Sequence, residues 1–206
     1  MIALMAVAAI AVASGMAAPQ LPRRPVIRFT DYPGAAVARG EQGAAVLRLL
    51  IDPKGKPRAC EVDEIIGTDF SSIFCAHLMR ARFTPARDGQ GQPSYGVWRG
   101  ALSFFLPDRP GEIRYPVESP PDLGVRPTAE QAHGERPSQL ELIVRIGVTG
   151  SIEECEAKTE ADAAVWPALC DELKRSGWRD QVRYDSAGHA LSYVRQIKVA
   201  LLPPNP

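Results

Sequence analysis

The sequence predicts an α+β fold made of two similar small units, each ordered strand, strand, helix, strand, with the helix packed on one face of an antiparallel sheet. Two observations predict this fold. The first is an internal repeat, because the spacing between Cys60 and Cys75 recurs between Cys155 and Cys170. The second is that each cysteine pair lies within the same succession of strand-like and helix-like segments. A chain of 206 residues can hold one large domain or two small ones, and the repeat favours two.

A shift of 95 positions aligns the central parts of the two units without a gap. The shift becomes 94 upstream and 97 or 98 downstream, which predicts small insertions in loops. We interpret this agreement as a tandem duplication with a diverged second copy. Besides the cysteines, the aligned residues are Gly55 and Gly150, Phe70 and Val165, Phe74 and Leu169, Leu78 and Leu173, and Phe83 and Trp178.

Each unit is expected to begin with a β-hairpin. The first strands are the apolar runs 44–52 and 140–148, which end at the turn signals Pro53-Lys54-Gly55 and Thr149-Gly150. The return strands are expected over 57–66 and 151–158, and each carries the first cysteine of its pair.

An amphipathic helix and a long last strand complete each unit. Apolar residues four positions apart, at 70, 74 and 78 and again at 165, 169 and 173, predict one helix face directed at the sheet. Pro167 suits the first turn of a helix, so the second helix is expected to start near Trp166. The last strands are expected at roughly 94–106 and 190–202, which are rich in Val, Leu, Tyr and Phe.

The four cysteines are expected to form two disulfides. Four cysteines in an exported chain allow three pairings, and the duplication selects the one in which each unit closes on itself. We predict Cys60 with Cys75 and Cys155 with Cys170, each bond joining the second strand to the helix. A four-cysteine zinc site and free core thiols in a cytosolic protein are the alternatives.

The first 18 residues have the features of an export signal. They carry no charge, consist mostly of Ala, Met, Ile and Val, and offer two cleavage motifs, Ala11-Val12-Ala13 and Gly15-Met16-Ala17. An inner-membrane anchor is the alternative, although spans usually have about 20 strongly apolar residues. We therefore expect a periplasmic protein that contacts the membrane only if this segment stays uncleaved.

A Pro-rich linker is expected between the units. Seven prolines fall within residues 107–137, where apolar periodicity is lost. The predicted domains are therefore 27–107 and 138–203, joined by the linker 108–137.

The two halves of the chain carry opposite net charges. Residues 19–107 hold 12 basic and 8 acidic side chains, a net charge of +4, whereas residues 108–206 hold 12 basic and 16 acidic side chains, a net charge of −4. Either the units dock on each other or they take different partners.

Several functional classes are excluded or disfavoured by composition and motifs. Zero net charge argues against nucleic acid as a partner. None of His77, His133 and His189 has a partner at a spacing typical of a metal site or catalytic triad, and no nucleotide-binding motif occurs. The acidic runs at 61–64 and 153–156 are expected to face solvent. We predict no enzyme, no catalytic residue, no cofactor and no metal.

The first unit resembles the C-terminal domain of TonB-like energy transducers over about residues 29–106. The resemblance rests on motifs that occur in order. These are Asp31-Tyr32-Pro33, Gly40 and Gly43, Ile51-Asp52 with Gly55, and Arg82-Phe83-Thr84-Pro85-Ala86. The second unit lacks the last motif and has Arg175 to Asp180 in its place.

This resemblance implies a periplasmic module that captures an extended peptide of an outer-membrane transporter, or another periplasmic protein, by β-augmentation on its last strand. The expected binding edge is Tyr95, Gly96, Val97, Trp98 and Arg99. A transducer also needs a long spacer before this module, whereas here the module begins within about ten residues of the apolar segment, which span only about 30 Å. We therefore expect a relative without the transduction role. The alternative is a structural or assembly module of the envelope, for instance a homodimer.

Overall fold

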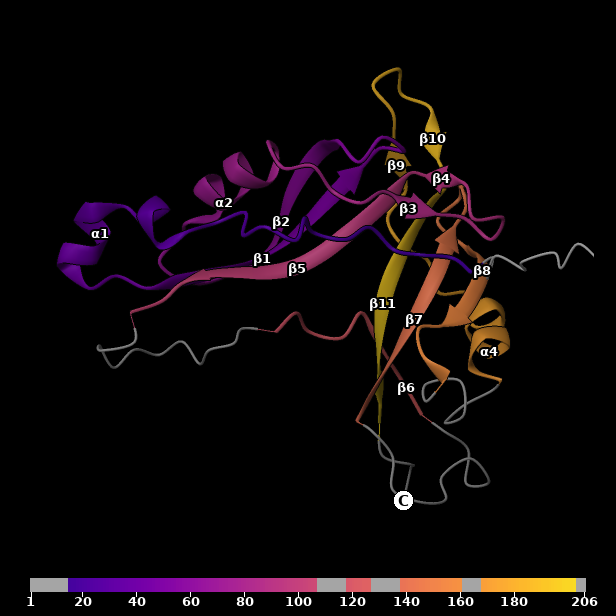
Figure 1. The fold of residues 1–206 in the computed structure, drawn as a ribbon. Coiled ribbons are helices and arrows are strands. Elements are labelled where there is room, and N and C mark those ends of the chain that lie inside the picture. Colours follow the sequence, from indigo (N-terminus) through magenta and orange to yellow (C-terminus); the bar gives the residue numbers. More distant parts are fainter. Residues whose placement is uncertain (1–14, 107–117, 127–137, 161–167, 203–206) are drawn as a thin grey trace, which may run out of the picture.

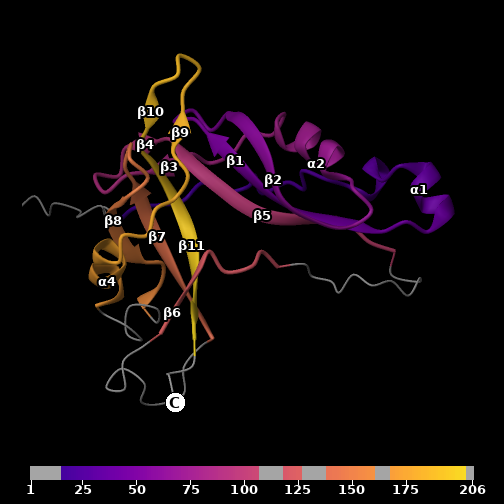
Figure 2. The same cartoon turned by 180° about the vertical axis from the view of Figure 1, so that it is seen from behind.

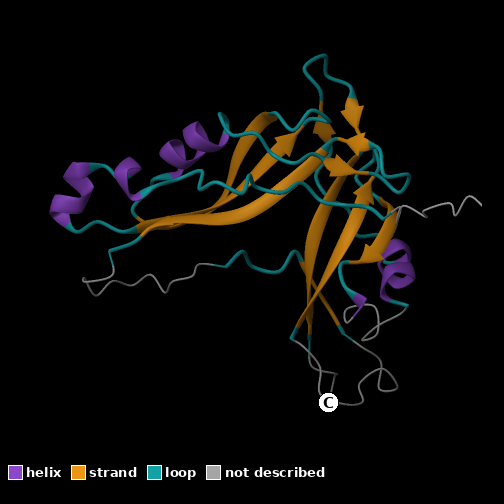
Figure 3. Cartoon of the chain, in the orientation of Figure 1, coloured by secondary structure: helices purple, strands orange, loops and turns teal. Residues whose placement is uncertain are grey.

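The computed structural model describes residues 15–106, 118–126, 138–160 and 168–202 (Figure 1). These residues form two lobes, a first lobe of residues 29–106 and a second lobe of residues 138–202. An N-terminal strap, residues 15–21, and the segment 118–126 lie against both lobes. Figure 3 shows few helices and many strands, which confirms the predicted α+β class.

The first lobe contains a hairpin, a helix and a long last strand, as predicted. Its elements are a 3₁₀ turn Phe29–Asp31, α1 Gly34–Arg39, β1 Gly43–Ile51, β2 Pro57–Gly67, α2 Ser71–Leu78, β3 Ala86–Arg87, β4 Pro93–Ser94 and β5 Gly96–Phe104.

From its hairpin onward the second lobe repeats this order, and the stretch that would correspond to α1 lies outside the described residues. Its elements are β7 Gln139–Ile146, β8 Ile152–Ala157, α4 Leu169–Arg175, β9 Arg183–Tyr184, β10 Ala190–Leu191 and β11 Tyr193–Leu201. The expected helix start near Trp166 lies outside the described residues. The shared order agrees with the predicted duplication, which stays a prediction, as do the exact domain bounds.

Helix α2 forms because its apolar side chains recur on one face and cover the first sheet. Phe74 and Leu78 are completely buried against Leu47 and Leu49 of β1. The next strand residue, Leu50, belongs instead to the core of the second lobe. Because successive side chains of a strand point to opposite faces, β1 is buried on both sides.

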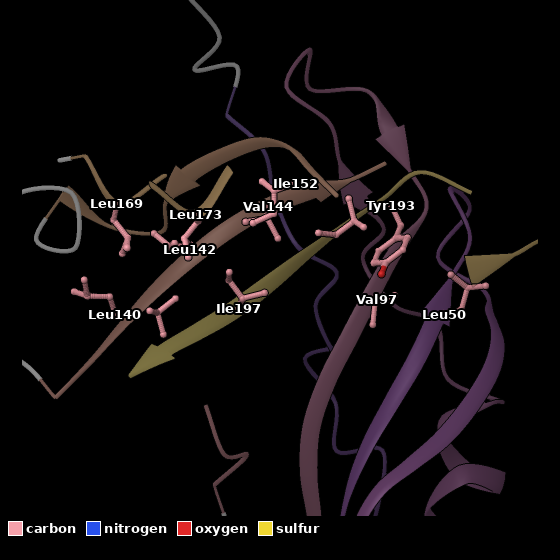
Figure 4. Close-up of a cluster of buried hydrophobic side chains, with 12 residues drawn as sticks. Leu50, Val97, Leu140, Leu142, Val144, Ile152, Leu169, Leu173, Tyr193 and Ile197 are labelled. Carbon is pink, nitrogen blue, oxygen red and sulfur yellow. The ribbon is translucent and has the colours of Figure 1, made fainter. Parts of the chain in front are cut away.

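The core of the second lobe lies between β7, β11 and α4 and extends into the first lobe. Figure 4 shows Leu169 and Leu173 of α4 beside Leu142 of β7, with Leu50 and Val97 of the first lobe at the other end of the cluster. Each buried aliphatic side chain of this kind contributes about 1.5–3 kcal/mol relative to an exposed one. The lobes therefore share a hydrophobic core.

One sheet runs through both lobes in the order β2-β1-β5-β11-β7-β8. The joint is a short parallel pairing of β5 with β11, in which Gly96 lies opposite Val194 and Val97 opposite Arg195. Beyond the joint the two strands separate, so that they form a V in both views (Figures 1 and 2). The sequence predicts a sheet in each unit but not this connection.

Helices α2 and α4 cover opposite faces of the shared sheet. Trp98 of β5 packs with the cluster around α2, whereas its neighbour Val97 packs with the cluster around α4. Adjacent strand residues face opposite sides, so the two cores lie on opposite faces.

The turns of the two lobes correspond closely. Phe83 N–H donates to Gly55 O at 2.9 Å, and Asp180 N–H donates to Gly150 O at 2.8 Å. Both glycines have positive φ, +76° and +81°, which is strained for other residues. Asp180 therefore occupies the place of Phe83, and the proposed match of Phe83 with Trp178 was wrong by two positions.

The segment 118–126 belongs to the predicted linker. Its β6, Leu123–Val125, pairs in parallel with residues 199–201 of β11. Asp122 N–H also donates to Lys198 O at 2.8 Å, so this segment adds to the edge of β11 that faces the V.

Candidate functional site

The outer edge of β5 is the candidate binding site. Its inner edge pairs with β1 over the whole strand, from Gly96 with Ile51 to Phe104 with Gly43. Its outer edge pairs with β11 only at Gly96 and Val97. The N–H of Val194 donates to Tyr95 O at 2.9 Å, so the backbone of Tyr95 faces outward.

The alternation of backbone direction identifies the unpaired groups. Because Tyr95 faces outward, every second residue after it does so as well. Val97 meets β11, and Arg99, Ala101 and Ser103 then present their N–H and C=O groups at the outer edge. Among the residues that the structure describes, no strand pairs with these three.

The five predicted edge residues are thus divided between different environments. β11 donates a hydrogen bond to Tyr95 O and lies opposite Gly96 and Val97. The backbone of Trp98 faces β1. The Trp98 ring packs on the α2 face, with its centroid 5.9 Å from that of Phe83. Arg99 is the first residue of the open edge. That this edge binds a peptide stays a prediction.

A cavity of about 350 Å³ lies where β5 and β11 separate. Its walls come from β5, β11, the strap and the segment 118–126. They are Val97, Trp98 and Arg99 of β5, Gln196 and Lys198 of β11, Ser119, Asp122, Lys158 and residues 18–21. The cavity therefore lies at the narrow end of the open edge, next to the joint of β5 and β11.

The N-terminal strap crosses this joint in extended conformation. Ala17 and Arg87 exchange backbone hydrogen bonds of 3.1 and 2.8 Å, and Gln20 and Thr84 exchange bonds of 3.1 and 3.0 Å. Met16 is buried in one cluster with Ile143 and Val194 of the second lobe. The strap thus contacts both lobes.

Gly96 leaves room for the strap, because a Cβ at this position would lie 2.4 Å from the Pro19 side chain.

The two candidate cleavage motifs would leave different parts of the strap in the mature protein. A cut after Ala13 leaves the strap whole, whereas a cut after Ala17 removes Met16 and the pairing with Arg87. Residues 1–14 lie outside the described residues.

A buried charge network joins the lobes beside the cavity. The Arg195 side chain is 1% exposed and forms ion pairs with Asp122 and with Asp180, the latter at 2.6 Å. Arg99 pairs with Asp63 at 2.7 Å and with Asp122 at 3.6 Å. Asp122 therefore connects β5 of the first lobe with β11 of the second.

Further ion pairs show that the lobes dock on each other, which was one of the two alternatives for their opposite charges. Arg48 of β1 bonds to Asp63 at 2.9 Å and lies 3.9 Å from Asp180. Arg183 of β9 pairs with Glu61 of β2. Sequence reasoning missed this network, although a charged residue within the apolar run Tyr193–Leu201 was a usable signal for Arg195.

Burial and nearby cations have opposite effects on the pKa of these aspartates. Burial alone would raise the pKa of Asp180, but the Arg195 guanidinium and hydrogen bonds outweigh it and hold the pKa below its usual value. Burial would likewise raise the pKa of Asp63, but the guanidinium groups of Arg99 and Arg48 outweigh it and lower this pKa. Burial beside Asp180 raises the pKa of Tyr193, whose hydroxyl donates to Gln181 O at 2.7 Å.

These lowered pKa values predict acid sensitivity. Asp63 and Asp180 bind protons less readily in the folded than in the unfolded state, where Asp titrates near about 3.9. Their contribution to stability is complete above that pKa and disappears as pH falls through the lower folded-state values. We expect urea unfolding to give a constant free energy between about pH 7 and 5 and a falling one below about pH 4. In Asp180→Asn the free energy of unfolding should fall less steeply with pH. An equally steep fall in that variant would contradict a contribution of Asp180 to the acid sensitivity.

Both predicted disulfides are confirmed. Cys60 of β2 is bonded to Cys75 of α2, and Cys155 of β8 to Cys170 of α4, with Cα atoms 5.9 and 5.5 Å apart. The alternatives of a zinc site and of free thiols were therefore wrong.

The described histidines have ordinary surroundings. His77 Nδ1 lies 3.9 Å from an Asp31 carboxylate, and the exposed His189 lies 3.2 Å from Asp185. His133 falls outside the described residues. Within the part of the chain that the structure describes, no group of three or more His, Cys, Asp or Glu side chains could hold a metal ion.

The fold and the edge together define a small α+β domain with an open sheet edge at its last strand. Residues 30–102 of the chain match the family model of the Gram-negative bacterial TonB protein C-terminal domain. The match begins in the 3₁₀ turn and ends within β5, so it covers the first lobe. Residues 30–102 thus form a TonB C-terminal-like domain. No curated protein and no solved structure matches it.

TonB-family proteins belong to the cell envelope and take part in energy transduction, and their C-terminal domain is a non-catalytic binding domain. Over the residues described, no helix is both long and apolar enough to span a membrane.

Proposed function

We propose that this chain is a periplasmic, non-catalytic binding module that captures an extended peptide on the outer edge of β5. The observation that carries the proposal is the row of outward backbone groups at Arg99, Ala101 and Ser103 within the matched domain or directly after it. Unpaired strand edges readily accept another chain, because main-chain hydrogen bonds need no particular sequence.

Of the two strand edges that face each other beyond the joint, the edge of β5 is the better candidate for peptide binding. The facing edge of β11 is already paired with β6 and bonded to Asp122. The β5 edge begins where β11 leaves it and continues to Ser103. The partner we propose is a peptide of an outer-membrane transporter or another periplasmic protein with an extended segment.

The periplasmic location rests on the apolar segment before the strap and on the two disulfides, which persist in oxidising compartments. A signal cleaved after Ala13 agrees best with the buried Met16. An uncleaved segment would instead anchor the protein at the inner membrane. We interpret the second lobe as a diverged duplicate of the first, because its elements, turns and disulfide correspond.

A structural or assembly role is the second candidate. The observation in its favour is the pairing of β5 with β11, which shows that this edge joins lobes. The same pairing between two chains would give a homodimer by exchange of the second lobe. Sedimentation at high concentration separates the candidates, since a monomer that binds peptide excludes the exchange.

Peptide binding should be lost when the edge amide of Ala101 is removed. Proline at this position deletes an outward N–H but no hydrogen bond to β1, so the fold is expected to stay intact. We expect Ala101→Pro to bind fluorescein-labelled peptides from the periplasmic plug segments of outer-membrane transporters at least about ten-fold more weakly, as measured by anisotropy.

Ala101→Val is the matched control, because it keeps the amide and should bind like the wild type. Val97→Pro is a less specific variant, since Val97 takes part in the joint with β11. Circular dichroism melting checks the fold of each variant. Equal binding by wild type and Ala101→Pro, or no binding by either, would overturn the proposed function.

A further inference from the structure

Among the described residues, the outer edge of β5 is paired with β11 at one end and with no strand at the other. The strands β5 and β11 run parallel from their joint and then separate, as both views show (Figures 1 and 2). An extended peptide can add to Arg99, Ala101 and Ser103, but it meets β11 where Val97 pairs with Arg195. A peptide on this edge therefore ends at the closed end of the V, in the cavity between the strands.

The direction of the peptide decides which of its termini reaches the cavity. A peptide antiparallel to β5 has its C-terminus beside the first residues of β5, where the cavity lies. A parallel peptide would place its N-terminal ammonium group there. The charges of the cavity therefore select between the two directions.

Those charges are mostly positive. Arg99, Lys158 and Lys198 line the cavity together with a single acidic side chain, Asp122. Asp122 is already engaged by Arg195 and by the N–H of Lys198. A carboxylate in this place would be attracted, whereas an ammonium group would be repelled.

Lys198 is the cation best placed to bind a new carboxylate. Lys158 Nζ is held by Glu141 at 2.5 Å, and Arg99 by Asp63 at 2.7 Å. Lys198 Nζ contacts the Ser119 carbonyl at 3.5 Å, a weak interaction, and no carboxylate lies within 4.0 Å of it among the described residues. Gln196, on the same face of β11, also lines the cavity.

We propose that the cavity binds the C-terminal carboxylate of an extended peptide, which runs antiparallel to β5 and is held by Lys198. This inference rests on the proposed function and narrows its partner to chains that end in an extended segment. Capture of a terminal carboxylate beside an added strand is a known mode of peptide recognition. A charged hydrogen bond of this kind is stronger than a neutral one.

Two forms of one peptide test the proposal on the full chain. The probe is a plug-segment peptide with an N-terminal fluorescein, made once with a free C-terminal carboxylate and once as the amide. We expect the carboxylate form to bind about ten-fold more tightly at low salt. In Lys198→Gln this difference should disappear. Lys174→Gln on the exposed side of α4 is the control and should keep it.

The outcomes separate this inference from the proposed function. If both forms bind equally to the wild type, and Ala101→Pro abolishes both, the edge binds peptides but the carboxylate proposal is wrong. The same conclusion follows if Lys198→Gln keeps the preference. If neither form binds, both proposals fail.

Discussion

Replacement of Arg195 by leucine should lower the free energy of unfolding by about 3–5 kcal/mol. Its guanidinium is almost completely buried and pairs with two carboxylates, of Asp122 and Asp180. Leucine has no charge, so both carboxylates would remain buried without their main counter-ion. Such a loss is much larger than that of a surface ion pair, which is worth about 0–1 kcal/mol. Urea unfolding at neutral pH measures it.

A matched control and a rescue make this prediction specific. Arg179→Leu changes an exposed arginine whose contact is the Thr149 carbonyl, and it should alter stability by less than about 1 kcal/mol. Asp122→Asn with Asp180→Asn should recover part of the loss in Arg195→Leu, because no unpaired charge then remains. A loss below about 1 kcal/mol in Arg195→Leu would contradict the buried network.

Removal of one disulfide should cost about 3 kcal/mol. Cys60 and Cys75 are 15 positions apart, and closing a loop of this length restricts the unfolded chain by about that amount. Cys60→Ala with Cys75→Ala should therefore unfold at a lower urea concentration than the wild type. The second bond has the same separation, so Cys155→Ala with Cys170→Ala should show a loss of similar size.

The two disulfide variants also test how strongly the lobes are coupled. Because the lobes share a core and ion pairs, loss of either bond should shift one common transition. Two separate transitions, with only one shifted, would contradict the shared core. A wild type whose stability does not change on full reduction would contradict the predicted contribution of the bonds.

The local structure was predictable from sequence because its signals are local. Apolar runs ending at Gly55 and Gly150 marked the hairpins, and apolar residues four positions apart marked the helices. The repeated cysteine spacing identified both disulfides. These patterns follow from hydrogen bonding and side-chain direction within a few residues, so they are visible without knowledge of the fold.

The joint and the network could not be predicted in this way. The pairing of Gly96 with Val194 depends on two backbone edges, which have no sequence signature. Asp122 lies among prolines, in a stretch that gave no sign of a strand or an ion pair. Residues 15–18 of the strap fall within the predicted export signal, whose composition is apolar, and the same apolar character lets Met16 enter the core.

Amide hydrogen exchange at the outer edge of β5 tests the central claim most directly. In the free protein, Arg99, Ala101 and Ser103 should exchange fast, whereas Gly100 and Leu102, whose backbone groups face β1, should exchange slowly. Addition of a saturating plug-segment peptide should slow exchange at the first three. The claim would be contradicted if these amides kept their rates while those at another edge, such as β2, became protected.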